Sequence, residues 1–214
     1  MAKRFVIMGD VVGSGETDGS AVMDRLNPLV EHVQRRLGDS ILSPLTITLG
    51  DEFQGVVADH QAIVRTIFAF EAERLARGGE IALRYAAAVG EIDTELNTET
   101  AHGMLGPALT TARRRLGDKS RSRRRFAFDL QSPDQSILFE NLFDVLARRL
   151  EDWSPEESAY IAALVSDLDA AEIARLHDRD KTTVYRRRNS APVQDYLALE
   201  NAALAAARIL DLTP

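Results

Sequence analysis

The sequence predicts an α+β fold with a ferredoxin-like N-terminal domain over residues 1–130 and an all-helical domain over residues 131–214. Apolar runs with strand and helix periodicity alternate in the order β-α-β-β-α-β, which is the split βαβ arrangement with an antiparallel sheet and helices on one face. A polar, Pro-containing stretch over residues 131–135 predicts a linker. The segment after it has only helical periodicity, and its two short helices predict a helix-turn-helix.

Each element of the first domain follows from hydrophobic spacing and from residues that end helices. A short apolar run predicts a buried first strand that ends at Gly9 and Asp10. Helical spacing predicts helices over residues 22–37 and 63–75, and both stop at glycines. Two strand-like runs joined by Gly50 and Asp51 predict a β-hairpin over residues 45–57. A strand, a loop, a helix and a last strand are expected over residues 81–89, 97–106, 107–116 and 125–128.

Two acidic turns are predicted to lie side by side. In a split βαβ sheet the end of the first strand adjoins the tip of the central hairpin, so Asp10 comes next to Asp51. Paired carboxylates suit Mg²⁺ or Mn²⁺ when a triphosphate supplies the other ligands, although two ordinary turn-forming Asp residues are the alternative. Glu52 follows on a strand and is expected to point away from Asp51, toward solvent or an Arg. The loop amides expected to cradle a phosphate are those of Val11, Val12, Gly13 and Ser14.

Three stretches of the sequence resemble motifs of class III nucleotidyl cyclases. Residues 10–14 (DVVGS) resemble their first metal-binding motif, and residues 49–53 (LGDEF) resemble their second and also the signature of diguanylate cyclases. Residues 106–114 are similar to their late helix, which carries an Asn and an Arg four positions apart. With its C-terminal extension the chain looks most like the SatD family, well over residues 4–130 and loosely beyond. The resemblance implies a cyclase-type palm whose metal ligands are Asp10 and Asp51.

The sequence departs from the cyclase pattern where the cyclases recognise base and ribose. Ile47 replaces a Lys that reads the purine, Pro107 replaces an Asp of the late motif, and Thr110 replaces the Asn that orients the ribose. Only the late-motif Arg survives, as Arg114, with an Arg on either side that makes the register ambiguous. The resemblance therefore implies binding of a nucleotide or a metal, and Thr110 and Arg114 are catalytic only if the protein is an enzyme.

Composition and charge exclude several classes of protein. The 214 residues are 45% hydrophobic and 28% charged, as in soluble globular proteins, and the absence of Cys excludes disulfides and thiolate sites. No apolar run is long enough for a membrane helix or a signal peptide, so a cytoplasmic protein is expected. The net charge of -7 conceals a run of eight basic and one acidic residues over positions 113–125. This run predicts contact with phosphate, or else a solvated helix face.

The second domain carries signals for several helix starts. Ser154, Pro155 and Glu157 predict a capped helix with a capping box. A short helix capped by Asp169, a turn with Asp178 in the left-handed conformation and a basic helix then predict a helix-turn-helix. A plain helical hairpin with a basic end is the alternative. The residues expected to contact DNA, with arginines on phosphates and Thr and Tyr at base edges, are Lys181, Thr182, Thr183, Tyr185, Arg186 and Arg187.

The sequence as a whole predicts a DNA-binding regulator whose palm binds a nucleotide, a divalent metal ion or both. A homodimer is expected because helix-turn-helix proteins usually bind two half-sites. The rival prediction is a nucleotidyl cyclase-like enzyme that acts on a nucleoside triphosphate with two metal ions held by Asp10 and Asp51. A third is an adaptor whose palm keeps the fold and binds no ligand.

Overall fold

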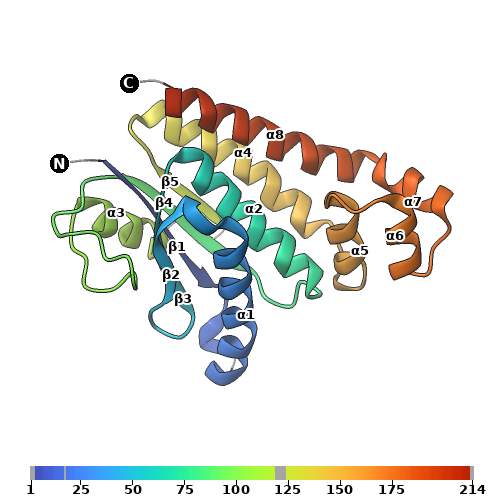
Figure 1. Ribbon diagram of the computed structural model, residues 1–214, viewed down its shortest axis with the longest axis horizontal. Coiled ribbons are helices and arrows are strands. Elements are labelled where there is room, and N and C mark those ends of the chain that lie inside the picture. The colour runs from blue at the N-terminus through green and yellow to red at the C-terminus, as the bar shows by residue number, and fades with distance from the viewer. Residues whose placement is uncertain (1–2, 17, 119–123, 213–214) are drawn as a thin grey trace.

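The computed structural model describes residues 3–16, 18–118 and 124–212 (Figure 1). Its described strands form one sheet in the order β2-β3-β1-β4-β5. The central strand β1 pairs antiparallel with β3 and β4, and β5 pairs parallel with β4. The predicted order of strands and helices is confirmed, and β5 makes the sheet mixed. The strands are β1 (Arg4–Val11), β2 (Ile41–Ile47), β3 (Glu52–Val57), β4 (Leu83–Gly90) and β5 (Phe126–Asp129).

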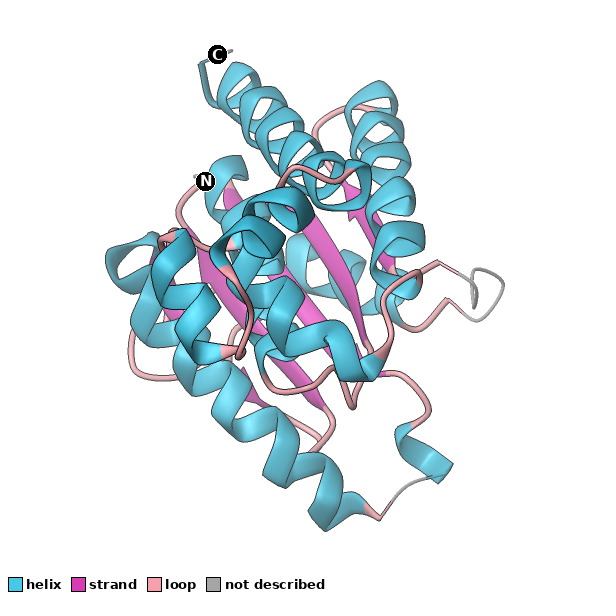
Figure 2. Cartoon of the chain, turned by 90° about the vertical axis from the view of Figure 1, so that its right-hand side faces the viewer, coloured by secondary structure: helices cyan, strands magenta, loops and turns pink. Residues whose placement is uncertain are grey.

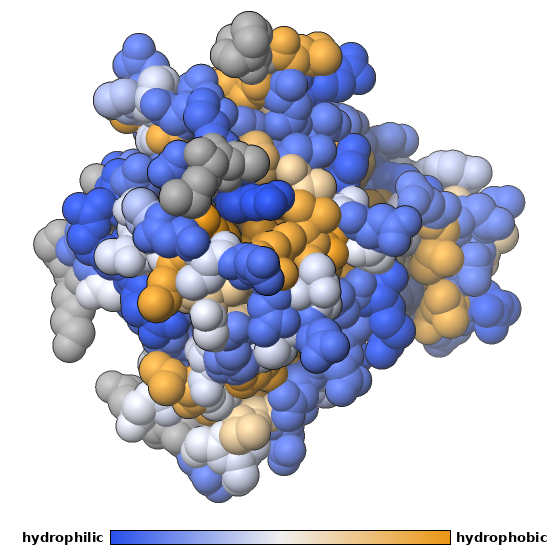
Figure 3. All heavy atoms as spheres, turned by 60° about the vertical axis from the view of Figure 1, so that its left-hand side comes forward, coloured by the Kyte–Doolittle hydropathy of each residue, from blue (hydrophilic) through white to orange (hydrophobic). Residues whose placement is uncertain are grey.

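Helices cover both faces of the sheet, which corrects the expectation of helices on one face. α1 (Gly19–Leu37) and α2 (His60–Ala76) pack on one side, and α3 (Pro107–Leu116) packs against β1, β4 and β5 on the other. Helical periodicity shows that a helix has an apolar stripe but not which face of the sheet it covers. We refer to the sheet with α1, α2 and α3 as the palm. Figure 3 views the α3 side, where apolar areas lie between hydrophilic side chains.

The helices after the sheet pack on the α2 side of the palm. α2 contacts both α5 and α8, and α4 contacts β5 and α8 (Figure 1). One buried cluster runs from Ile7 and Phe53 of the palm through Ile161 to Tyr196. The division at residue 130 stays a prediction, because the two parts share this core. The helices are α4 (Pro133–Glu151), α5 (Pro155–Val165), α6 (Ala170–Leu176), α7 (Lys181–Arg188) and α8 (Ala191–Leu212).

Helix caps account for several boundaries and correct two predictions. The stretch expected to be a linker is the start of α4, where Ser132 and Gln135 form a capping box. The capping box expected at the start of α5 is absent, since the Ser154 side chain makes no cap hydrogen bond. The Glu157 amide donates instead to the Ser154 backbone carbonyl at 3.1 Å, and the Glu157 carboxylate accepts from Arg187 at 2.9 Å.

The last turn of α8 is joined to the first turn of α2. Asp211 accepts hydrogen bonds from the backbone N–H groups of His60 at 3.0 Å and Gln61 at 3.2 Å, and its Oδ1 lies 2.7 Å from His60 Nδ1. The carboxylate thus satisfies amides at a helix start that have no partner within the helix. Within the described ranges, no helix is both long and apolar enough to pass through a membrane.

Candidate functional site

Three charged side chains meet at one end of the sheet, on the face that α3 covers. Asp10 of β1 lies directly opposite Glu52 of β3 and Arg84 of β4. Side chains alternate along a strand, so these three point to the same face as Met8 and Gln54, two residues further along. With Arg113 of α3 they form a group that we call the Asp10 cluster, defined as Asp10, Glu52, Arg84 and Arg113.

Asp10 is nearly buried, with 8% of its surface exposed. Arg84 binds both of its oxygens, through Nε at 2.9 Å and Nη2 at 2.5 Å. Burial raises the pKa of the Asp10 carboxyl above its ordinary value, Arg84 partly offsets this, and the nearby Asp51 charge adds to it. A bidentate guanidinium therefore already occupies the carboxylate that the sequence assigns to a metal.

Asp51 lies where the sequence predicts it, beside the end of β1. The Val11 amide donates to the Asp51 carbonyl at 3.0 Å, and the Ser14 hydroxyl donates to Asp51 Oδ2 at 2.6 Å. Gly50, at the tip of the β2–β3 hairpin, has φ +87°, which favours glycine. Strand pairing and a tight turn thus bring the two predicted metal ligands together.

The loop after β1 offers fewer free amides for a phosphate than the sequence implies. The amides of Val11 and Val12 already donate to the backbone carbonyls of Asp51 and Ala82, at 3.0 and 2.8 Å. Gly13 (φ +73°) and Ser14 follow at the start of a 3-10 turn (Ser14–Glu16), and their amides carry no hydrogen bond to a described residue. An anion-binding nest at this loop is therefore limited to Gly13 and Ser14.

The carboxylates present fit a divalent metal ion only together with a phosphate. No group of three His, Asp or Glu side chains within the described ranges could hold a metal ion. Both oxygens of Asp10 accept from Arg84, and one oxygen of Asp51 accepts from Ser14. Mg²⁺ commonly binds through one or two carboxylates, water and substrate phosphates. Asp10 and Asp51 match that donor set once Arg84 shares or releases Asp10.

A cavity of about 500 Å³ adjoins the Asp10 cluster on the α3 side of the sheet. Thr110 and Arg114, the residues that the cyclase resemblance marks, line it. Arg114 is 72% exposed at its side chain and lies 3.9 Å from Asp129, at the outer edge of the sheet. The residues that line this cavity are Met8, Gln54, Met104, Leu105, Gly106, Leu109, Thr110, Arg113 and Arg114.

Arg113, and not Arg114, reaches over the sheet toward the Asp10 cluster. Its guanidinium donates to Gln54 Oε1 at 3.1 Å and lies 3.8 Å from Glu52. Burial raises the pKa of Glu52, and the charge of Arg113 partly offsets this. Glu52 thus pairs with an Arg, which is one of the two outcomes that the sequence leaves open. Of the basic run over residues 113–125, residues 119–123 lie outside the described ranges.

Sequence reasoning missed Arg84 and Gln54, and it included Arg113 only as part of the basic run over residues 113–125 and as a neighbour of Arg114. One feature of the sequence could have pointed to Arg84, because it is the single charged residue in the apolar run of β4. The alternation of side chains along that strand places it on the α3 face. Its partner Asp10 cannot be read from the sequence, since pairing depends on which strands adjoin. Gln54 carries no such signal, and the basic run that contains Arg113 does not show which of its arginines reaches Glu52.

The second candidate site is the α6–α7 pair, which faces the viewer in Figure 2 together with α5. Ile173 of α6 and Val184 of α7 are fully buried. Asp178, in the turn between them, has φ +49°, which confirms the left-handed conformation that the sequence predicts. Asp180 caps α7 by accepting from the Thr183 amide at 2.8 Å. The geometry of two short helices joined by a tight turn is therefore present.

The six residues expected to contact DNA divide into two groups. Lys181, Thr182 and Arg186 are exposed, and Tyr185 is 51% exposed. The Thr183 hydroxyl donates to the cap residue Asp180, and Arg187 donates to Glu157 of α5. The Thr183 and Arg187 side chains are therefore engaged in contacts within the protein. The neighbouring Arg188 donates to the carbonyls of Leu164 and Leu168 and so fixes α7 to the end of α5.

Several solved structures resemble part of this chain. Two are structures of a bacterial light-regulated adenylyl cyclase, each 15% identical over 59% of this chain, with TM-scores of 0.45 and 0.43 and with 42% and 43% of their own chains covered. A third is the guanylate cyclase domain of RhGC from Catenaria anguillulae in complex with GTP, 18% identical over 54% of this chain and 72% of its own, with a TM-score of 0.35. The chain thus spans less than half the length of the first two structures.

Among curated proteins, no relative matches the chain. The model of the SatD family matches residues 4–205, which includes the palm, the α6–α7 pair and most of α8. The match extends past the motifs at residues 10–14, 49–53 and 106–114. It also covers the segment beyond residue 130, where the sequence motifs give only a loose resemblance to the family. The chain belongs to the SatD family.

Proposed function

We propose that this SatD-family protein is a cytoplasmic DNA-binding regulator whose palm binds a nucleotide on the α3 side of the sheet. The observation that carries the proposal is the cavity of about 500 Å³ beside the Asp10 cluster. Ligand sites in proteins are commonly concave, largely apolar and supplied with a few polar groups and shifted pKa values. Asp10 and Glu52 both have raised pKa values at this position.

The distribution of charge orients the proposed ligand. Its phosphates lie at the sheet end, within reach of the Gly13 and Ser14 amides, and Arg113 donates to them. The base and sugar occupy the cavity against Leu109 and Thr110. Mg²⁺ or Mn²⁺, carried by the phosphates, is held by Asp10 and Asp51 and neutralises the phosphate charge.

The test is thermal unfolding with each nucleoside triphosphate, with and without Mg²⁺ or Mn²⁺. A ligand at about one hundred times its Kd stabilises the native state by about 2.7 kcal/mol, which raises the Tm by about 5–10 °C for a chain of this size. We expect a metal-dependent shift that disappears in the double variant Asp10→Ala, Asp51→Ala. The control is Asp39→Ala, an exposed carboxylate next to α1. An equal shift in the double variant contradicts the site.

The same mixtures test the enzyme alternative. Formation of a cyclic or otherwise altered nucleotide that requires Asp10 and Asp51 would favour a cyclase-like enzyme over a sensor. Thr110→Ala and Arg114→Ala would then lower turnover more than binding. The proposal favours binding without turnover, because Arg84 occupies Asp10 and the Arg114 side chain points to Asp129 at the sheet edge.

The DNA-binding part of the proposal rests on the exposed side of α7. Lys181 and Arg186 are free to meet phosphates, and Thr182 and Tyr185 are free to meet base edges. Arg186→Ala should weaken binding to duplex DNA and reduce the salt dependence by about 0.9 for the lost phosphate contact. Fluorescence anisotropy at several salt concentrations measures both. The control is Arg148→Ala, an exposed arginine on α4.

An unchanged affinity and salt slope in Arg186→Ala would contradict DNA contact through α7. We also expect a homodimer, because one α6–α7 pair reads only a half-site. Sedimentation velocity with and without DNA tests this. A monomer on DNA at all protein concentrations would contradict the dimer.

A further inference from the structure

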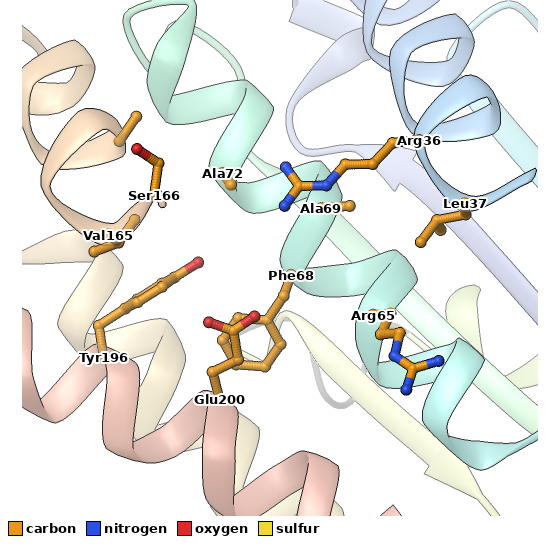
Figure 4. A pocket seen from close by; sticks show the side chains of 11 residues that line it. Arg36, Leu37, Arg65, Phe68, Ala69, Ala72, Val165, Ser166, Tyr196 and Glu200 are labelled. Carbon is orange, nitrogen blue, oxygen red and sulfur yellow. The ribbon is translucent and has the colours of Figure 1, made fainter. Parts of the chain in front are cut away.

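A second cavity lies on the opposite side of the palm, where α1 and α2 meet α5 and α8. Its volume is about 300 Å³, and Figure 4 shows its side chains. It shares no lining residue with the cavity beside the Asp10 cluster. The residues that line it are Arg36, Leu37, Arg65, Phe68, Ala69, Ala72, Ala162, Val165, Ser166, Tyr196 and Glu200.

Three polar side chains converge on this cavity without a protein partner. The Arg36 guanidinium reaches in from α1, while the Tyr196 hydroxyl and the Glu200 carboxylate reach in from α8 (Figure 4). The Tyr196 ring is buried, Glu200 is half-buried and Arg36 is exposed, so the three groups run from the interior to the open side of the cavity. No described side chain makes a hydrogen bond or an ion pair within 4.0 Å to any of these three side chains, although the Arg36 charge acts on the Glu200 pKa. A ligand in the cavity could therefore supply hydrogen-bond partners that the described part of the chain does not supply.

The electrostatics of the three groups specify what a ligand must supply. Burial raises the pKa of Glu200, the charge of Arg36 partly offsets this, and Asp167 adds to it, so the carboxylate lacks a close cation. Burial and the Glu200 charge raise the pKa of Tyr196 well above its ordinary value, which keeps the phenol a hydrogen-bond donor. Arg36 supplies further donors. The complementary ligand therefore has a cationic nitrogen near Glu200 and an anionic oxygen near Arg36 and Tyr196.

The remaining wall is apolar and comes from both parts of the chain. Phe68 and Ala69 of α2 lie on one side of the cavity and Val165 of α5 on another (Figure 4), and Ala162 of α5 also lines it. A side chain with aliphatic or aromatic character buries its surface there. Arg65 lies at the rim and adds positive charge on the side of α2.

We propose that this cavity is a binding site for a small zwitterion, a free α-amino acid with an apolar side chain. Its ammonium group binds Glu200, its carboxylate binds Arg36 and Tyr196, and its side chain packs against Phe68 and Ala162. The ligand would connect palm helices to α5 and α8, which flank the α6–α7 pair. Occupancy would then stabilise the docking of the helical segment on the palm.

Isothermal titration calorimetry of the full chain with free L-amino acids tests the proposal. We expect one of the apolar amino acids, with leucine and phenylalanine as the first probes, to bind one molecule per chain. Its N-acetyl derivative lacks the cation and its methyl ester lacks the anion, so both should bind about tenfold more weakly or not at all. Inorganic phosphate and a nucleoside monophosphate are the competing probes, because Arg36 and Arg65 would also attract phosphate.

Matched variants assign the binding to this cavity. Glu200→Gln, Arg36→Gln and Tyr196→Phe should each weaken the amino acid by about tenfold or more. Arg35→Gln is the control, since it removes the same charge from the next residue of α1, which does not line the cavity. Circular dichroism shows whether each variant is folded. The variant Asp10→Ala, Asp51→Ala should keep amino-acid binding, which separates this site from the proposed nucleotide site.

Three results would overturn the proposal. The first is no binding heat and no change in Tm with any free amino acid. The second is binding that Arg35→Gln weakens as much as Arg36→Gln. The third is tight binding of phosphate or of a nucleoside monophosphate at Arg36 while every amino acid fails, which would assign the cavity to a different class of ligand.

Discussion

Two carboxylate–arginine groups lie on the two faces of strand β4, and they differ in burial, in the pKa shift of the carboxylate and in their distance from a cavity. On the α2 side, Glu71 is fully buried and accepts from Tyr85 at 2.8 Å, Arg74 at 2.9 Å and Arg125 at 2.5 Å. We call these four residues the Glu71 cluster. On the α3 side, Arg84, the neighbour of Tyr85 in β4, belongs to the Asp10 cluster beside a cavity of about 500 Å³.

The pKa values of the carboxylates in the two clusters are shifted in opposite directions. Burial alone would raise the pKa of Glu71, but the charges of Arg125 and Arg74 and the Tyr85 hydrogen bond outweigh it and lower that pKa. In the Asp10 cluster, burial outweighs the arginines and raises the pKa values of Asp10 and Glu52. A carboxylate whose charge partners outweigh its burial holds the fold together, whereas carboxylates whose burial outweighs their partners, beside a cavity, are the better candidates for binding.

The largest expected effect is on the Glu71 cluster. Glu71→Gln leaves the buried guanidiniums of Arg74 and Arg125 without their counter-charge, and breaking a buried pair in this way typically destabilises by about 3–5 kcal/mol. Thermal unfolding should therefore show a Tm lower by about 6–20 °C. The control is Glu31→Gln on α1, whose pair with Arg35 is exposed on both sides and contributes about 0–1 kcal/mol. Equal losses in the two variants would break the comparison.

The lowered pKa of Glu71 also predicts how the stability of the protein depends on pH. The folded pKa of Glu71 lies below its unfolded value, so its contribution is fully present above the unfolded pKa of about 4.3. It is lost as the pH falls through the lower, folded pKa. The free energy of unfolding of Glu71→Gln should therefore depend less on pH below about 4.3 than that of the wild type. Parallel curves for the two proteins would contradict this linkage.

A smaller effect is expected for Arg84→Gln in the Asp10 cluster. The substitution leaves Asp10 nearly buried without its cation, which should destabilise by about 1–3 kcal/mol. It also frees both Asp10 oxygens, so Mg²⁺ alone should raise the Tm of the variant more than that of the wild type. Thermal unfolding with and without Mg²⁺ measures both effects. No added stabilisation by Mg²⁺ would show that Arg84 does not compete with a metal ion for Asp10.

The smallest effect on stability is expected for Arg113→Gln. Its side chain is half exposed and its pair with Glu52 is long, at 3.8 Å, so its loss should change the free energy of unfolding by less than about 1 kcal/mol. The Tm shift caused by a nucleoside triphosphate should nevertheless fall. Arg114→Gln is the matched control, and the sequence favours Arg114 as the functional arginine. A larger loss of the nucleotide shift in Arg114→Gln would reverse our assignment.

Local signals in the sequence predicted the parts of the fold that depend on neighbouring residues. Periodicity and glycines predicted the order of strands and helices, and the βαββαβ order was enough to bring Asp10 beside Asp51. The left-handed turn at Asp178 followed from the local need of two helices joined by four residues. Each of these features depends on residues close together in the sequence or on a common strand topology.

Features that depend on tertiary placement were not predictable. The Arg84–Asp10 pair requires knowledge of which strands adjoin, and the apolar stripe of α3 does not state which face it covers. Arg113 and Arg114 are adjacent in sequence, and only the rotation of α3 over the sheet separates their roles. The cavity around Tyr196 and Glu200 forms where four helices meet, so no single stretch of sequence contains its pattern.

The hydrogen bonds of Asp211 make two amides of α2 into reporters of α8. The His60 and Gln61 N–H groups are satisfied by a carboxylate 151 and 150 positions away, not by their own helix. When α8 leaves the palm, these amides lose protection from solvent although α2 itself stays helical. Hydrogen exchange at His60 and Gln61 therefore measures the undocking of the last helix directly. Any ligand that fastens α8 to the palm should slow exchange at these two positions.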